Sequence, residues 1–260
     1  MNTRSKSPPA RATIVMCWIA LVATVACNGL FEYLRLGGTT SAEVSNQVFT
    51  WFMPAGYVFS IWGVIYAALI IWMIAETRRA REGSSLSLRN ATLFVLSCVL
   101  NVSWLVAFHF QQILTSLVIL VALWIVLALL YVSLRDSEGR SRLNLAPFSL
   151  YFAWSTVAVI VNATNFATRL VETPLIVSQV STVVLAFAAL AVAYLSTRNS
   201  KDYVFPLVII WALIGVAVNV AQADTLIAMI VLAATAVTAL VMYVPTLADW
   251  MGVSKRSQED

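Results

Sequence analysis

The residues of this chain that could do chemistry are aromatic rings and amides, and they recur at helical spacing. Phe59, Trp62 and Tyr66 follow one another at i, i+3 and i+7, so a helix would place the three rings on one face. The next apolar segment adds Asn101 and Trp104, which are three residues apart. These side chains suit a flat, mostly apolar ligand, because such a ligand stacks on aromatic faces and is oriented by a few hydrogen bonds.

A third set of residues follows further along the chain. Trp154, Ala158 and Asn162 are spaced at i, i+4 and i+8, along one face of a helix. Residues 211–219 repeat this order of aromatic, small residue and amide, which indicates either a duplication or two similarly packed helices. Small residues and amides are also what transmembrane helices use to pack against one another. The residues alone therefore leave two interpretations open, a ligand cavity and ordinary helix packing.

The apolar segments that carry these residues lack ionisable groups. No Asp, Glu, Lys or Arg lies in the middle of any of them. Ion-coupled pumps and transporters generally need a buried charge, and a retinal protein needs a lysine for its Schiff base. The sequence therefore argues against both classes.

The chain has a single histidine, His109. Zinc and iron sites need several converging His, Cys or carboxylate groups, and a Ser-His-Asp set needs a buried acid. We therefore predict no catalytic residue, no metal site and no enzymatic activity. His109 is interpreted as an interfacial polar residue, with a contact to haem iron or to another ligand as the alternative.

The elements that must position these residues are transmembrane helices. Hydrophobic residues make up 61% of the chain and charged residues 11%, whereas soluble domains carry about 25% charge. A bilayer core is crossed by about 20 apolar residues in a helix. We predict an all-α, polytopic transmembrane helical bundle of about eight spans, in the segments Thr13–Phe31, Pro54–Ile74, Ala91–Phe110, Ile113–Leu134, Ala146–Phe166, Pro174–Leu195, Tyr203–Gln222 and Thr225–Tyr243.

The basic residues predict how the bundle is oriented. Of the 16 Lys and Arg, all but Arg35 and Arg169 lie at the amino end or on loops of one parity. The positive-inside rule then makes both termini cytoplasmic, as a multi-pass protein of the inner (plasma) membrane. Short polar tails are predicted at residues 1–12 and 247–260. The longest external loop, Glu32 to Met53, contains Trp51 and is long enough to fold back over the bundle as a lid.

The three sets of motifs resemble the TspO/MBR family (translocator protein, or tryptophan-rich sensory protein). Pro54…Phe59-Ser60-Ile61-Trp62…Tyr66, then Asn101-x-x-Trp104, then Trp154-x3-Ala158-x3-Asn162 occur in the family's order. The amino-acid sequence around these motifs is most similar to that of the longer bacterial members. The resemblance implies a TspO-like five-helix domain over residues 13–168, followed by three additional transmembrane helices over residues 169–246.

The resemblance also implies a function. Members of the family hold porphyrins and other flat lipophiles in a cavity that the first long loop caps. We expect a membrane binding protein or sensor for a porphyrin-like tetrapyrrole or an isoprenoid. The alternatives are an uncoupled transporter or exporter of a lipophilic metabolite and, ranked last, an enzyme that degrades a bound pigment.

The expected partners are membrane lipids and the lipophilic ligand, without nucleic acid, and a homodimer is compatible with the sequence. No cofactor is expected to be required, although a porphyrin or haem would be a suitable ligand. The predicted ligand-binding residues are Trp51, Phe59, Trp62, Tyr66, Asn101, Trp104, Trp154, Ala158 and Asn162.

Overall fold

The fold is a set of long helices. The computed structural model describes residues 10–83, 86–136 and 144–250, without the side chains of residues 10 and 245–250, so the predicted tails fall largely outside it. Every regular element in these ranges is helical, which confirms the all-α prediction. The elements are α1 (Ala10–Leu34), α2 (Ser41–Asn46), the 3-10 helix η1 (Gly56–Ser60), α3 (Ile61–Arg81), α4 (Leu88–His109), α5 (Ile113–Arg135), α6 (Ala146–Leu170), α7 (Leu175–Ser200), α8 (Val204–Val220) and α9 (Thr225–Trp250).

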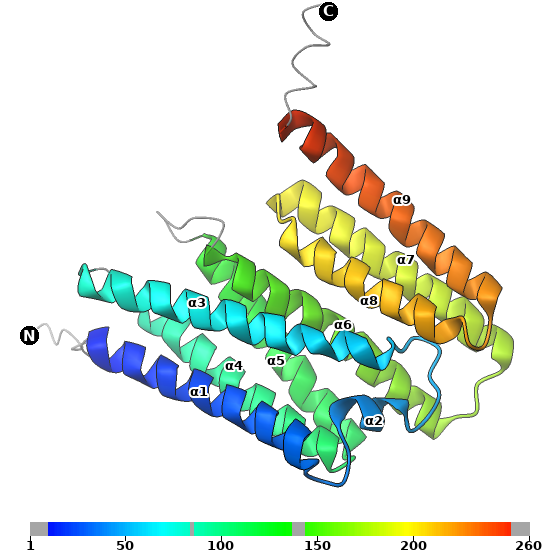
Figure 1. The fold of residues 1–260 in the computed structure, drawn as a ribbon, viewed down its shortest axis with the longest axis horizontal. Coiled ribbons are helices and arrows are strands. Elements are labelled where there is room, and N and C mark those ends of the chain that lie inside the picture. The colour runs from blue at the N-terminus through cyan, green and yellow to red at the C-terminus, as the bar shows by residue number, and fades with distance from the viewer. Residues whose placement is uncertain (1–9, 84–85, 137–143, 251–260) are drawn as a thin grey trace, which may run out of the picture. The chain divides into compact units, whose positions relative to one another are not determined.

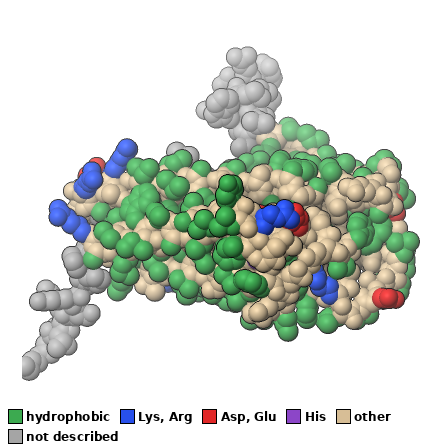
Figure 2. Space-filling view, turned by 60° about the horizontal axis from the view of Figure 1, so that its bottom comes forward, with side chains coloured by type: hydrophobic (Ala, Val, Ile, Leu, Met, Phe, Trp, Pro, Cys, Tyr) green, Lys and Arg blue, Asp and Glu red, His purple; other side chains and the backbone are tan. Residues whose placement is uncertain are grey.

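The helices have the length and surface of membrane spans. In the described ranges seven of them are long and apolar enough to cross a bilayer, and the apolar helix α8 has 17 residues. At 1.5 Å per residue α8 is about 25 Å long, near the lower limit for a span. Large apolar side chains such as Ile19, Ile71 and Val118 are exposed on the helix surfaces, and apolar side chains are spread over the face shown in Figure 2. The protein is therefore a multi-pass membrane protein.

The helices form two compact units. The first unit consists of residues Met1–Gln47 and Phe59–Phe166, and it contains α1 to α6 (Figure 1). Within it α4 packs against α5 and α1, and α1 packs against α3. The indole N–H of Trp124 on α5 donates to the hydroxyl of Thr156 on α6 at 2.9 Å. The long helices of this unit are α1, α3, α4, α5 and α6.

The second unit consists of residues Val48–Val58 and Ala167–Asp260. Its helices α7, α8 and α9 pack against one another. Two aspartates begin helices here: Asp202 Oδ1 accepts from the first backbone N–H groups of α8, and Asp224 Oδ1 does so for α9. Asp224 Oδ2 also accepts from Gln179 of α7 at 2.7 Å. The short segment Val48–Val58 thus belongs with helices that follow it by more than a hundred residues.

The start of α3 differs from the sequence prediction. The apolar pattern predicts a helix from Pro54, but α3 begins at Ile61, after η1. Pro54 has no backbone N–H, and the N–H of Ala55 donates to the carbonyl oxygen of Gly215 on α8. Helix α3 therefore begins later than predicted, because the N–H of Ala55, the first backbone donor after Pro54, is bound to α8.

Candidate functional site

Trp62 lies at the centre of an aromatic cluster in the first unit. Its ring stacks on Tyr66 of the same helix, with ring centroids 5.7 Å apart. It also contacts Trp104 of α4 at 5.7 Å, and Tyr151 and Trp154 of α6 at 5.9 and 6.3 Å. The structure therefore brings together predicted residues from α3, α4 and α6.

Two further rings extend the cluster. Phe59 meets Trp154 edge to face at 5.9 Å, and Phe108 stacks on Trp104 at 5.4 Å. Trp104 and Trp154 are only 2% exposed, whereas Phe59 and Trp62 are partly exposed. The cluster is therefore buried at Trp104 and Trp154 and partly exposed at Phe59 and Trp62.

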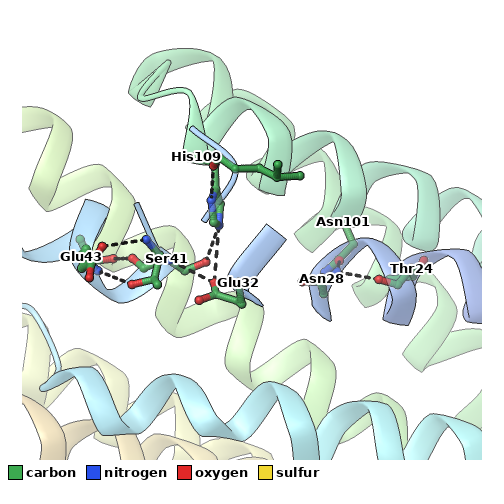
Figure 3. Close-up of polar contacts among 10 residues, drawn as sticks. Thr24, Asn28, Glu32, Ser41, Glu43, Asn101 and His109 are labelled. Atoms are coloured by element: carbon green, nitrogen blue, oxygen red, sulfur yellow. Dashed lines mark hydrogen bonds and ion pairs between the residues drawn. The ribbon is translucent and has the colours of Figure 1, made fainter. Parts of the chain in front are cut away.

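A chain of polar contacts crosses from α1 to this cluster (Figure 3). The amide nitrogen of Asn28 donates to Oδ1 of Asn101 at 2.9 Å and to the backbone oxygen of Thr24 at 2.9 Å. The hydroxyl of Tyr66 donates to the same Oδ1 of Asn101 at 3.4 Å. Both acceptor positions of the Asn101 side-chain oxygen are therefore used within the protein.

Two donors in the cluster have no protein partner. Among the described residues, the indole nitrogens of Trp104 and Trp154 are buried without a hydrogen bond. Buried donors are usually paired, because an unpaired one costs about 1–3 kcal/mol. Two such groups in one aromatic cluster are suited to a partner that accepts hydrogen bonds.

The remaining predicted residues lie in two places. Ala158 and Asn162 are buried on α6, one and two turns beyond Trp154, and the Asn162 amide donates to the Ala158 backbone oxygen at 3.0 Å. Trp51 belongs to the second unit, where its ring contacts Phe49 at 5.8 Å. The contribution of Trp51 to the site stays a prediction.

A comparison with known protein families shows which family the chain belongs to. The family model described as TSPO-like protein matches residues 14–244. The chain belongs to the TSPO-like family. The match continues through α7, α8 and most of α9, beyond the region in which the short motifs carry the resemblance. Comparisons with curated proteins and with solved structures gave no match.

One tryptophan of this TSPO-like chain lies elsewhere than its sequence position suggests. Trp72 is predicted at the membrane interface by its place near the end of an apolar segment. It is instead 2% exposed and packs between Phe94 and Phe148, with ring centroids 5.1 and 4.7 Å away. Trp72 belongs to the core of the five-helix unit, because α3 extends to Arg81, beyond the predicted span.

His109 is also more buried than predicted. Its side chain is fully buried at the end of α4, with Nε2 3.1 Å from the Ser41 hydroxyl and 3.5 Å from a Glu32 carboxylate oxygen (Figure 3). Its Nδ1 lies 3.0 Å from the backbone oxygen of Leu36. The position at the last residue of α4 fits the interfacial prediction. The burial was not predicted, and it arises because the chain between α1 and α2 folds over this end of α4, where Gly37 approaches the His109 backbone too closely for a Cβ.

The contacts of His109 also bear on its chemistry. Both ring nitrogens already have partners within the protein. In a Ser-His-Asp triad the hydroxyl and the acid face opposite nitrogens, whereas here Ser41 and Glu32 face the same one. His109 is placed to hold the loop between α1 and α2.

Sequence reasoning missed four members of the polar and aromatic cluster. Tyr151 lies one turn before Trp154 and contacts Trp62, and Phe108 lies one turn after Trp104 and stacks on it. Thr24 and Asn28 are two polar residues at i and i+4 in an otherwise apolar helix, the signal by which they could have been found.

Proposed function

We propose that this TSPO-like protein binds a flat lipophilic ligand at the aromatic cluster and acts as a membrane binding protein or sensor. The ligand class that we propose is a porphyrin-like tetrapyrrole or an isoprenoid with an oxygen-bearing group. The observation that carries the proposal is the pair of unpaired indole donors on Trp104 and Trp154 within the aromatic cluster.

The hydrogen-bonding capacity of the cluster supports a ligand that accepts. Indole nitrogens only donate, and the oxygen of Asn101 already accepts from Asn28 and Tyr66. A ligand carbonyl or carboxylate oxygen would satisfy these donors, whereas a purely hydrocarbon ligand would leave them unpaired. The carboxylates of a porphyrin provide such oxygens.

The arrangement of rings supports a flat ligand. Trp62 and Tyr66 are nearly parallel, with an interplanar angle of 20°, and Trp104 and Phe108 at 19°. Flat ring systems stack in an offset manner on such faces. The partly exposed Phe59 and Trp62 offer the accessible edge of the cluster.

The test is a titration of the detergent-purified protein with protoporphyrin IX, followed by tryptophan quenching and by the porphyrin absorption band. We expect saturable binding with a Kd on the order of micromolar, weakened by Trp104→Ala and by Trp154→Ala. Trp124→Ala is the matched control, because Trp124 lies on α5 and bonds to Thr156 outside the cluster. Equal affinity in the native protein and both cluster variants would argue against this site.

The topology is part of the same proposal. Both termini are placed in the cytoplasm of a cell with the protein in its inner membrane, on the charge pattern of the loops. Reporter fusions at residue 260 and within residues 35–40 should report opposite sides of the membrane. Porphyrin flux into proteoliposomes, if seen, would indicate transport in addition to binding.

A further inference from the structure

Helix α8 holds the segment that leads into the aromatic cluster. Within the second unit, the carbonyl oxygen of Gly215 accepts from the backbone N–H of Ala55 at 3.0 Å. The indole N–H of Trp211, one turn earlier on α8, donates to the backbone oxygen of Val58 at 3.3 Å. The Trp211 ring also meets Tyr57 edge to face at 5.4 Å. Two backbone groups and one ring of the segment are thus bound to one face of α8.

Gly215 makes this close approach possible. A Cβ at this position would overlap Cγ2 of Val58 and lie 3.2 Å from Cβ of Pro54. Gly215, Pro54 and Val58 are all buried. The missing side chain of Gly215 forms a notch in α8, and Pro54 and Val58 occupy that notch.

The bonds to α8 meet a need created by the membrane. The segment is not α-helical, so its backbone groups lack the internal partners that a span provides. Gly215 lies five residues before the end of α8 at Val220, about 7.5 Å along the helix axis. At that depth, a backbone N–H and a carbonyl without partners would be costly, and α8 supplies partners for both.

The segment bound to α8, from Pro54 to Val58, leads directly into the aromatic cluster. The 3-10 helix η1 runs from Gly56 to Ser60, so Val58, which α8 binds, is followed at once by Phe59 of the aromatic cluster. Trp62 follows in the first turn of α3. We propose that Gly215 and Trp211 are positioning residues, through which the C-terminal helices fix the start of α3 and thereby Phe59 and Trp62. The consequence for ligand binding rests on the proposed function, whereas the positioning itself does not.

The test is hydrogen–deuterium exchange of the full-length protein in detergent, with Gly215→Ala as the main variant. We expect backbone exchange over residues 54–62 to rise about tenfold, because overpacking the notch must displace the segment. Gly29→Ala on α1 is the matched control, since a Cβ there meets nothing within 4 Å. Val58→Ala in the Gly215→Ala background removes the overlapping Cγ2 atom and should restore native exchange.

Several outcomes would overturn the proposal. Native exchange in Gly215→Ala, an equal rise in Gly29→Ala, or no restoration in the double variant would each do so. A rise limited to residues 54–58 would show that α8 holds the segment without positioning Phe59 and Trp62. If Gly215→Ala does not fold, Trp211→Phe removes the bond to Val58 and keeps the ring, and it should raise exchange over the same residues.

Ligand kinetics separate this inference from the proposed function. For protoporphyrin IX, we expect the dissociation rate constant to rise about threefold to tenfold in Gly215→Ala, as the start of α3 loosens, and to recover in the double variant. If the native protein does not bind protoporphyrin IX, the proposed function fails for this ligand while the exchange data still decide the positioning. A native dissociation rate in a variant with raised exchange would show that the segment does not control the site.

Discussion

The side-chain amide of Asn28 on α1 donates to the side-chain oxygen of Asn101 on α4 at a distance of 2.9 Å, with both residues buried. Because Tyr66 also donates to that oxygen, the orientation of the Asn101 amide is fixed, with its nitrogen on the side opposite these two donors. One contact thus links the packing of two helices to the chemistry of the proposed site.

Replacement of Asn28 tests this link. Asn28→Leu should destabilise the protein by about 1 kcal/mol, because it leaves a buried acceptor with one partner fewer. It should also weaken porphyrin binding a few-fold, since Asn101 is no longer held in one orientation. Thermal unfolding in detergent and the porphyrin titration measure the two effects. Asn46→Ala is the control, because its bond to Ala42 is exposed; no change in Tm or affinity for Asn28→Leu would contradict the link.

The unpaired indole nitrogen of Trp154 gives a second prediction. Trp154→Phe keeps an aromatic ring and removes a buried donor that has no protein partner, so the loss of that N–H should cost no stability. Affinity for a ligand that accepts a hydrogen bond there should fall about tenfold. Trp124→Phe should show the reverse, lower stability and unchanged affinity, because it breaks the bond to Thr156. The same pattern in both variants would speak against a ligand contact at Trp154.

Ala158 tests whether the ligand extends along α6. Ala158→Leu adds bulk one turn beyond Trp154 without removing a donor, and it should abolish porphyrin binding at a stability cost of about 1–3 kcal/mol. Titration and thermal unfolding of the same preparation separate the two effects. Ala163→Leu, at a half-buried position on α6, is the control for helix tolerance. Native affinity in a folded Ala158→Leu protein would remove Ala158 from the site.

The sequence predicted the features that have a local signal. The spans follow from the length of apolar runs. The family follows from short motifs at Trp62, Trp104 and Trp154, and the family match over residues 14–244 confirms it. Helical spacing also predicts that these rings share helix faces, and the structure joins the three faces. Whether they bind a ligand stays a prediction.

Features that depend on distant contacts were not predictable. The segment before α3 belongs with α8 because Gly215 has no side chain and the Trp211 indole N–H donates to the Val58 backbone oxygen. No local pattern around Pro54 encodes that partner. The similar spacing of Trp154 and Trp211 did not reveal that their indole groups have different partners. The indole of Trp211 bonds to a backbone oxygen, while that of Trp154 has no protein partner, so similar spacing serves different contacts.

The burial of His109 supports the last prediction, on the loop between α1 and α2. His109→Ala removes the contacts to the Ser41 hydroxyl and to the Leu36 backbone oxygen, so residues 36–41 should exchange backbone hydrogens faster. The free energy of unfolding should fall by about 2 kcal/mol, because the Ser41 hydroxyl and the Leu36 backbone oxygen each lose a hydrogen-bond partner. Exchange and thermal unfolding measure these effects, with Ser103→Ala on α4 as a control that breaks only a bond within the helix.

Glu32→Gln should have a smaller effect, since the amide oxygen can still accept from the Ser41 N–H. If His109→Ala leaves exchange of residues 36–41 unchanged, His109 does not hold the loop, and contacts such as the ion pair between Arg35 and Glu43 and the capping of α2 by Thr40 do so.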